Sequence, residues 1–258
     1  MDLSIVIPAF NERHTIGHAI AVVAAALPGI SKEIIIVDDG STDGTREWLR
    51  ETLPEGAGEA EAIELLSGGD IRLVPVAETN APAIRLRVIY HTQNQGKGGA
   101  LQTGFAAASG EVVVIQDADQ EYDPNDWVKM YPLIAERRVA DVVYGCRFYG
   151  SAHRSLYFHH FVANRLISTL FNIIYNQTLM DIEVCYKMMR REVLQSLRLS
   201  ANDFGIEIEL SARIALQRRW RIYEVGISYF GRTYAEGKKI NWKDGVKALW
   251  YLVKYRFA

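Results

Sequence analysis

Short apolar runs recur along the chain, and polar residues follow each run directly. A continuous apolar run of this length is typical of a strand that is covered on both faces. Segments of helical periodicity separate most of the runs, and this alternation predicts an α/β fold with a mostly parallel, doubly wound sheet and helices on both faces. The predicted strands are residues 3–7, 33–37, 85–90, 112–115, 141–147 and 221–225, and the predicted helices are residues 16–27, 99–108, 124–137, 156–175 and 204–219.

The run at 112–115 ends in carboxylates at alternate positions: Asp117, Asp119, Glu121 and Asp123. If the backbone stays extended there, these side chains share one side. Such a cluster needs a cation, and its hard oxygen ligands suit Mg²⁺ or Mn²⁺. The alternative is a solvated acidic turn before a helix that starts at Pro124. We interpret Asp123 as the N-cap of that helix, and Asp117 and Asp119 as metal ligands.

Polar residues also follow the other strands at the edge where doubly wound sheets bind ligands. Asn11 and Glu12 follow the first strand, and Asp38 and Asp39 follow the second. The first βα turn lacks the G-x-G-x-x-G pattern, so the usual dinucleotide fingerprint is absent from it. Lys97 lies among glycines at the start of a predicted helix, which is typical either of a phosphate cradle or of a simple turn.

Composition narrows the class of protein. The 258 residues are enough for one large domain, and a net charge of −2 argues against bulk nucleic-acid binding. The two cysteines, Cys146 and Cys185, fit a reducing cytosol. Neither a signal peptide nor an apolar stretch of about 18–20 residues is visible. We therefore expect a cytoplasmic protein that is soluble or peripheral, not integral, to the membrane.

Two segments differ from the regular alternation. Residues 53–83 are acidic and loop-like, and we expect a surface insertion there, with a short strand near 71–76, within a domain spanning 1–240. Residues 241–258 form an amphipathic helix. Its apolar face, flanked by lysines, suits either a membrane interface or packing on its own domain. That face consists of Trp242, Val246, Leu249, Trp250, Val253 and Phe257.

Five separated motifs together resemble family-2 glycosyltransferases of the GT-A fold, in the dolichol-phosphate mannose synthase-like branch. The resemblance covers nearly the whole chain except the insertion. The motifs are residues 5–12 (IVIPAFNE), 37–45 (VDDGSTDGT), 94–101 (NQGKGGAL), 117–119 (DAD) and 181–194, where Asp181 precedes Cys185-Tyr186-Lys187.

The resemblance implies an inverting, metal-dependent hexosyltransferase with a GDP- or UDP-sugar donor and a polyprenyl or dolichyl phosphate acceptor. Asp117 and Asp119 would hold Mg²⁺ or Mn²⁺, with Glu121 as a further ligand, and Lys97 would assist the phosphates. The residues that the resemblance places around the nucleotide sugar are Pro8, Ala9, Glu12, Asp38 or Asp39, Lys97, Asp117, Ala118, Arg232 and Lys238.

On the acceptor side, the resemblance assigns Arg147 and Arg165 to the lipid phosphate. Cys146 departs from the small hydroxyl residue usual beside Arg147. Arg232 and Lys238 match the basic residues of a mobile loop. An arginine within an apolar helix needs an anionic partner, so Arg165 has a lipid phosphate or an internal carboxylate as alternatives.

The acceptor decides the mechanism. A phosphate monoester is already anionic near neutral pH, because its second pKa is about 6, so it needs positioning more than a base. A hydroxyl acceptor would need a general base, for which Asp181 is the candidate, although Asp181 could instead orient the acceptor or bind the sugar. The main alternative is therefore a soluble family-2 enzyme that acts on a saccharide or protein hydroxyl. A peripheral position on the cytoplasmic membrane face and a separate membrane-spanning partner both fit the lipid hypothesis.

Overall fold

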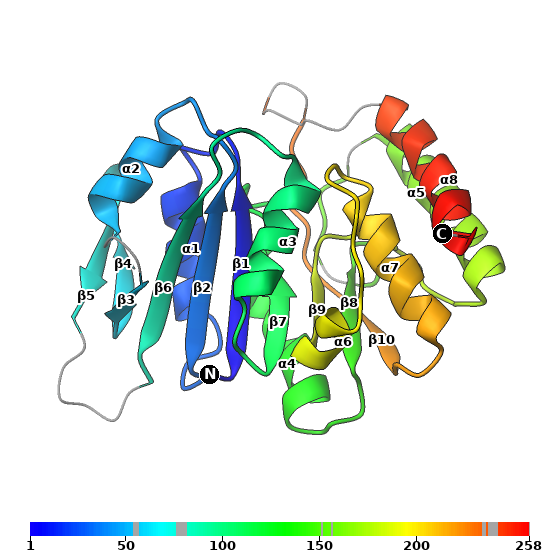
Figure 1. Ribbon diagram of the computed structural model, residues 1–258, viewed down its shortest axis with the longest axis horizontal. Coiled ribbons are helices and arrows are strands. Elements are labelled where there is room, and N and C mark those ends of the chain that lie inside the picture. The colour runs from blue at the N-terminus through cyan, green and yellow to red at the C-terminus, as the bar shows by residue number, and fades with distance from the viewer. Residues whose placement is uncertain are drawn as a thin grey trace.

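The computed structural model describes residues 1–53, 57–75, 82–150, 152–155, 157–233, 236 and 242–257. Within these residues, the main sheet has eight strands in the order β10-β8-β9-β7-β1-β2-β6-β3 (Figure 1). Its strands are β1 Leu3–Ala9, β2 Lys32–Asp38, β3 Ala57–Ala60, β6 Ile84–Tyr90, β7 Val112–Ile115, β8 Val142–Cys146, β9 Lys187–Arg190 and β10 Ile222–Gly226.

The central strands are parallel, which confirms the predicted sheet. β1 pairs in parallel with β2 on one side and β7 on the other, and β2 and β8 continue the parallel pairing with β6 and β10. β9 is antiparallel to both β7 and β8. The sequence of residues 180–187 suggests a turn and a strand; residues 181–186 form a loop, and the strand follows at Lys187–Arg190. This reversal places the amino end of β9 beside the carboxyl ends of its neighbours.

Helices cover both faces of the sheet, as predicted. α1 and α3 lie on opposite faces in Figure 1. The close approach of α3 to the sheet depends on Gly104, because a Cβ there would meet Val6 Cγ1 at 2.2 Å. The helices are α1 Ile16–Ala25, α2 Thr45–Thr52, α3 Lys97–Ala107, α4 Trp127–Ala135, α5 Phe158–Tyr175, α6 Arg191–Gln195, α7 Ile206–Gln217 and α8 Trp242–Phe257, with 3₁₀ turns η1 Ser67–Gly69 and η2 Pro124–Asp126.

The 53–83 region extends the edge of the sheet. β3 pairs antiparallel to β6, while β4 (Ala62–Leu65) and β5 (Ile71–Val74) form a separate two-stranded sheet. The short strand predicted near residues 71–76 corresponds to β5. Asp70 ties this region to the domain, because it accepts hydrogen bonds from Trp48 Nε1 at 2.8 Å and from Arg13 at 3.2 Å.

α8 has two different apolar faces. Leu252 and Tyr255 are fully buried, and the Leu252 carbonyl accepts a hydrogen bond from Tyr175 of α5 at 2.8 Å. On the face predicted for a membrane interface, Val246, Leu249, Trp250, Val253 and Phe257 are exposed, with Trp250 at 63% and Phe257 at 84%. Part of this helix therefore packs on its own domain, and its role at a membrane interface stays a prediction. Within the described residues, none of the helices combines the length and hydropathy needed to cross a membrane.

We expect Gly104→Ala to lower the free energy of unfolding by about 1–3 kcal/mol, because the added methyl overpacks the contact between α3 and β1. Urea denaturation measures the change. In the double variant Gly104→Ala/Val6→Ala, the smaller side chain at position 6 makes room for the methyl. Its loss should therefore be less than the sum of the two single losses, and strict additivity would contradict the proposed contact.

Candidate active site

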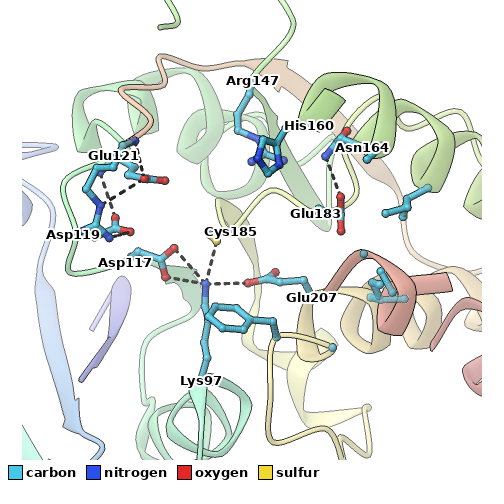
Figure 2. Close-up of a pocket in the computed structure, with 18 of the residues that line it drawn as sticks. Lys97, Asp117, Asp119, Glu121, Arg147, His160, Asn164, Glu183, Cys185 and Glu207 are labelled. Atoms are coloured by element: carbon cyan, nitrogen blue, oxygen red, sulfur yellow. Dashed lines mark hydrogen bonds and ion pairs between the residues drawn. The ribbon is translucent and has the colours of Figure 1, made fainter. Parts of the chain in front are cut away.

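A cavity of about 1320 Å³ lies at the carboxyl edge of the parallel strands. Because β9 runs the other way, the loop before it brings Glu183 and Cys185 to the same cavity as Asp117 at the end of β7. In Figure 2, Asp117, Asp119 and Glu121 lie on one side of the cavity, and Asn164 and Glu183 lie on the other. The cavity therefore joins segments from both halves of the chain.

The acidic cluster forms, but through a turn. The backbone does not stay extended after β7, since Gln120 adopts a φ of 62°. Asp119 then accepts a hydrogen bond from the Glu121 backbone at 3.2 Å, and both carboxylates meet Arg232. Asp123 accepts a hydrogen bond from Asn125 N at 2.9 Å at the start of η2, which confirms its prediction as a helix cap.

Lys97 connects the acidic cluster to the far side of the cavity (Figure 2). Its ammonium lies 2.8 Å from Asp117 Oδ1 and 3.2 Å from Glu207 Oε1, and it donates to Cys185 Sγ at 2.9 Å. Glu207 also pairs with the buried Lys187 at 2.6 Å. The pKa of Lys97 is raised well above its usual value, because its carboxylate neighbours outweigh the desolvation of the ammonium. Lys97 thus stays charged where a phosphate would need it.

The negative charge of the cluster is only partly balanced. Arg232 Nη2 lies 2.8 Å from Asp119 Oδ2, and its Nη1 lies 3.8 Å from Glu12. Burial and the like charges of Asp117 and Glu121 nevertheless raise the pKa of Asp119 to about 7. A cation would relieve this repulsion.

The donor set suits Mg²⁺ or Mn²⁺ chemically, since all its ligands are carboxylate oxygens. Within the described part of the chain, no group of three or more His, Cys, Asp and Glu side chains is arranged to hold a metal ion. A Mg²⁺ ion in a phosphate-handling site commonly takes one or two protein carboxylates and completes its shell with substrate phosphates and water. Asp117 and Asp119 therefore fit a site that the substrate completes.

Most of the residues predicted to bind the nucleotide sugar line the cavity: Pro8, Ala9, Glu12, Asp39, Lys97, Asp117, Ala118 and Arg232. Asp39 accepts hydrogen bonds from the backbones of Gln95 and Gly96, both at 2.8 Å, and so orders the loop before Lys97. Asp38 lies behind the cavity, fully buried, where Arg46 Nε donates to it at 2.6 Å. Of the two alternatives, Asp39 is thus the one that faces the cavity.

Arg147 and Asp181, both predicted as catalytic, form a pair with each other. Arg147 Nε and Nη2 donate to the two Asp181 oxygens at 2.6 and 2.7 Å, and its backbone N–H adds a third bond at 3.2 Å. Asp181 is completely buried, and the pKa of its carboxyl is lowered because Arg147 and Asn164 outweigh its desolvation. Arg147 lines the cavity and Asp181 stands behind it.

The other two predicted basic residues lie differently. Arg165 donates to the Met180 carbonyl at 3.4 Å and is not among the residues that line the cavity. Burial raises the pKa of Glu224 to about 7, even though the positive charge of Arg165 acts to lower it. Lys238 lies outside the described residues. The roles of Arg165 and Lys238 stay predictions.

Sequence reasoning overlooked several polar residues that line the cavity, and among them are Asn164, Glu183 and Glu207. A signal was available for each. Asn164 is a polar residue in an apolar helix, beside Arg165, and Glu183 lies inside the motif that contains Asp181. Glu207 belongs to a helix whose neighbouring residues are almost all apolar and buried.

Solved structures with a similar fold include glucosyl-3-phosphoglycerate synthase from Mycobacterium tuberculosis. Its complex with Mn²⁺, uridine diphosphate and phosphoglyceric acid matches with a TM-score of 0.65 at 21% identity, covering 99% of this chain and 78% of that chain. Its complex with Mg²⁺ and uridine diphosphate matches with a TM-score of 0.62 at 22% identity, covering 98% and 79%. At these identities the likeness establishes the GT-A fold.

Curated relatives match over most of the chain. A dolichol-phosphate mannosyltransferase of Pyrococcus furiosus is 25% identical over 93% of this chain and 61% of its own length. A polyprenol monophosphomannose synthase of Mycolicibacterium smegmatis is 28% identical over 91% and 79%. A dodecaprenyl-phosphate galacturonate synthase of Rhizobium johnstonii is 30% identical over 57% and 36%. The chain thus spans between about a third and four fifths of these relatives.

The family model itself matches the two halves of the domain on either side of β4. It is the model of glycosyl transferase family 2, and it matches residues 4–60 and 72–198. These ranges contain the strand ends that carry Glu12, Asp39 and Asp117, and also the Arg147–Asp181 pair. The chain belongs to glycosyl transferase family 2.

Proposed function

We propose that this protein transfers a hexose from a nucleotide sugar to a polyprenyl phosphate, with inversion at the anomeric carbon. One observation carries the proposal: a single cavity joins the acidic cluster to an apolar wall, and Arg147 also faces it. A nucleoside diphosphate with a divalent cation suits the acidic end. A phosphate suits the arginine, and a long hydrocarbon suits the apolar wall.

The apolar wall comes from α5 and α8, which pack together at one side of the domain (Figure 1). Phe161 and Leu166 of α5 and Val246 and Leu249 of α8 line the cavity, although each is also more than a third exposed. Exposed apolar side chains that continue from a cavity mark a binding surface. A polyprenyl chain would cover them, whereas a saccharide acceptor would leave them exposed.

The comparisons support this acceptor. The names of the relatives from Pyrococcus and Mycolicibacterium specify dolichol phosphate and a polyprenol monophosphate product. The structural neighbour is described in complex with uridine diphosphate and Mn²⁺, which supports a nucleotide-sugar donor and a divalent cation. We infer that this chain uses the same classes of donor and acceptor.

On the donor side, Asp117 and Asp119 would hold Mg²⁺ or Mn²⁺. A bound divalent cation supplies Lewis-acid stabilisation of the charge that develops on a leaving diphosphate. Lys97 is held at the start of α3 and adds a second, permanent positive charge beside Asp117. Arg232 also lines the cavity at the acidic cluster, where it contacts the carboxylates of Asp119, Glu121 and Glu12.

On the acceptor side, the chain positions the nucleophile more than it activates it. A phosphate monoester is anionic near neutral pH and needs no strong base. Asp181 is a poor base in this setting, because it is fully buried and accepts two hydrogen bonds from the Arg147 guanidinium. The pKa of its carboxyl is also lowered. Asp181 instead holds Arg147 in a fixed orientation toward the cavity. This arrangement disfavours the alternative with a hydroxyl acceptor, which would require deprotonation.

We infer that the enzyme works at a membrane surface. α5 exposes Phe158 and Ile173, at 77% and 73%, and α8 exposes Trp250 at 63%. Aromatic and aliphatic side chains on helices with nearby lysines are typical of helices that lie in the interface of a bilayer. A cytoplasmic membrane face and a separate membrane-spanning partner follow from this hypothesis and stay predictions.

The direct test is transfer of radiolabelled sugar from GDP- or UDP-hexose to a polyprenyl phosphate in detergent or vesicles, with Mn²⁺. A labelled product in the organic phase supports the proposal. If no donor yields such a product while a soluble saccharide becomes labelled, the hydroxyl-acceptor alternative is correct.

We expect Arg147→Ala to bind the nucleotide sugar with near-normal affinity but to transfer at least about 100-fold more slowly, because the acceptor phosphate loses its positioning charge. Calorimetry measures donor binding, and the organic-phase assay measures transfer. Arg221→Ala is the matched control. It breaks another Arg–Asp pair that is joined by two side-chain hydrogen bonds, the one with Asp141, and this pair lies outside the cavity. Normal transfer by Arg147→Ala would overturn the acceptor assignment.

We expect Asp119→Ala to abolish turnover, and chelation with EDTA to do the same reversibly in the unchanged protein, because the leaving diphosphate loses its cation. Turnover with and without added Mn²⁺ measures both effects. Asp123→Ala is the control, since Asp123 caps η2 in the same acidic stretch. Full activity after exhaustive chelation would contradict a metal-assisted reaction.

We expect Asp181→Asn to lower the free energy of unfolding by about 3–5 kcal/mol near neutral pH, because it leaves Arg147 without its countercharge. The folded pKa of Asp181 is lowered, so its contribution is complete above the unfolded value of about 3.9 and is lost as pH falls through the folded pKa. Urea midpoints for the two proteins should therefore converge on acidification. A pH-independent gap would contradict the charge assignment.

A further inference from the structure

Glu183 is a cavity carboxylate to which the proposed reaction assigns no role. It lies in the loop between α5 and β9, which the antiparallel direction of β9 brings to the carboxyl edge of the sheet. Glu183 lines the cavity and is only partly exposed. Figure 2 shows it across the cavity from Asp117, Asp119 and Glu121.

Glu183 differs from the other carboxylates by its partners. Asn164 Nδ2 donates to Glu183 Oε2 at 3.2 Å and to Asp181 Oδ1 at 3.0 Å, so Asn164 holds both carboxylates in place. Asp181 has Arg147 as a countercharge, but no lysine or arginine within the described residues lies at ion-pair distance from Glu183. Burial raises the pKa of Glu183, although the more distant charges of Arg147 and Lys187 act to lower it. Its carboxylate retains acceptor capacity toward a ligand.

Glu207 adds a second acceptor on the same side of Lys97. Its Oε2 pairs with Lys187 at 2.6 Å. Its Oε1 is buried, and although it lies 3.2 Å from Lys97 Nζ, it has no partner with hydrogen-bond geometry among the described residues. A buried acceptor without such a partner costs free energy unless a ligand donates to it. Both glutamates line the cavity.

The position of these two residues identifies the part of the substrate that they meet. The bond to the diphosphate breaks at the acidic cluster, and the bond to the acceptor oxygen forms near Arg147. The transferred sugar must lie between them, and Figure 2 shows Glu183 and Glu207 bordering that space on the side away from the acidic cluster. Sugar hydroxyls are donors that match unsatisfied carboxylate acceptors.

We propose that Glu183 is a specificity-determining residue that accepts a hydrogen bond from a hydroxyl or ammonium group of the transferred sugar, and that this pocket rejects uronic acids. This inference rests on the proposed function and deepens it. A uronic acid would place its own carboxylate beside Glu183, which has no ion-pair partner among the described residues, and the two like charges would repel each other. Neutral and aminated hexoses avoid that repulsion.

The expected effect is large enough to measure. A hydrogen bond to a charged group contributes more to binding than one to a neutral group, and the tenfold change in affinity that we expect corresponds to about 1.4 kcal/mol. Replacement of Glu183 by glutamine removes the charge and keeps the shape. It should weaken binding of a neutral nucleotide hexose roughly tenfold, and it should weaken discrimination against the matching uronate by about the same factor.

The experiment is calorimetry with Mn²⁺ on the wild type and Glu183→Gln. The probes are UDP, UDP-glucose and UDP-glucuronate, and GDP, GDP-mannose and GDP-mannuronate. Glu192→Gln is the matched control, because Glu192 pairs with Arg190 and is outside the cavity. A urea midpoint verifies that each variant is folded.

The proposal predicts that the wild type prefers the hexose to the uronate at least tenfold, that Glu183→Gln reduces this preference, and that its affinity for the free diphosphate changes less than twofold. Equal binding of hexose and uronate by the wild type would overturn it, and so would an unchanged preference in Glu183→Gln. If neither UDP nor GDP binds, the proposed function fails together with this inference, whereas nucleotide binding without sugar discrimination overturns the inference alone.

Discussion

Compensation of buried charge at the carboxyl edge of the sheet is the constraint on which the rest of the site depends. Parallel strands end together there, and the chain places carboxylates at several of those ends. Lys97 compensates Asp117 and Glu207, while Arg232 compensates Asp119 and Glu121. Charges out of water are stable only when they are paired and hydrogen-bonded. The basic residues are therefore as necessary to the architecture as the acidic ones, and they stand where a diphosphate and a cation would enter.

The reversed strand β9 determines what the rest of the cavity contains. Had β9 run parallel to β7, the loop that precedes it would lie at the opposite edge of the sheet. Its antiparallel pairing brings Asp181, Glu183 and Cys185 to the carboxyl edge of the sheet, where Asp181 pairs with Arg147 and Cys185 accepts from Lys97. One strand direction thus joins an acidic cluster from the first half of the chain to an arginine and an apolar wall from the second half.

The cavity has a charged end at the acidic cluster and an apolar wall formed by α5 and α8. α8 buries Leu252 and Tyr255 against the domain and still exposes Trp250 and Phe257, so it is both part of the fold and part of the outer surface. At the polar end, Asp181 likewise supports a residue that lines the cavity. Asp181, a candidate base in the sequence, lies behind Arg147, where it pairs with the guanidinium and does not line the cavity.

The sequence by itself determined the main parallel strands, the edge of the sheet at which the cavity lies, the family and the cap at Asp123, because hydrophobic periodicity and turn chemistry are local properties. It also placed Lys97, Asp117 and one of Asp38 and Asp39 at that edge, since each directly follows a strand or opens a helix. Only the tertiary structure decided that Asp38 lies behind the cavity, that Asp181 pairs with Arg147 and that Arg232 contacts Asp119. It also decided that Glu183 has no ion-pair partner among the described residues. These relations join residues from separate elements, so they depend on the direction of β9 and on which charges remain unpaired after packing, and no local pattern encodes either.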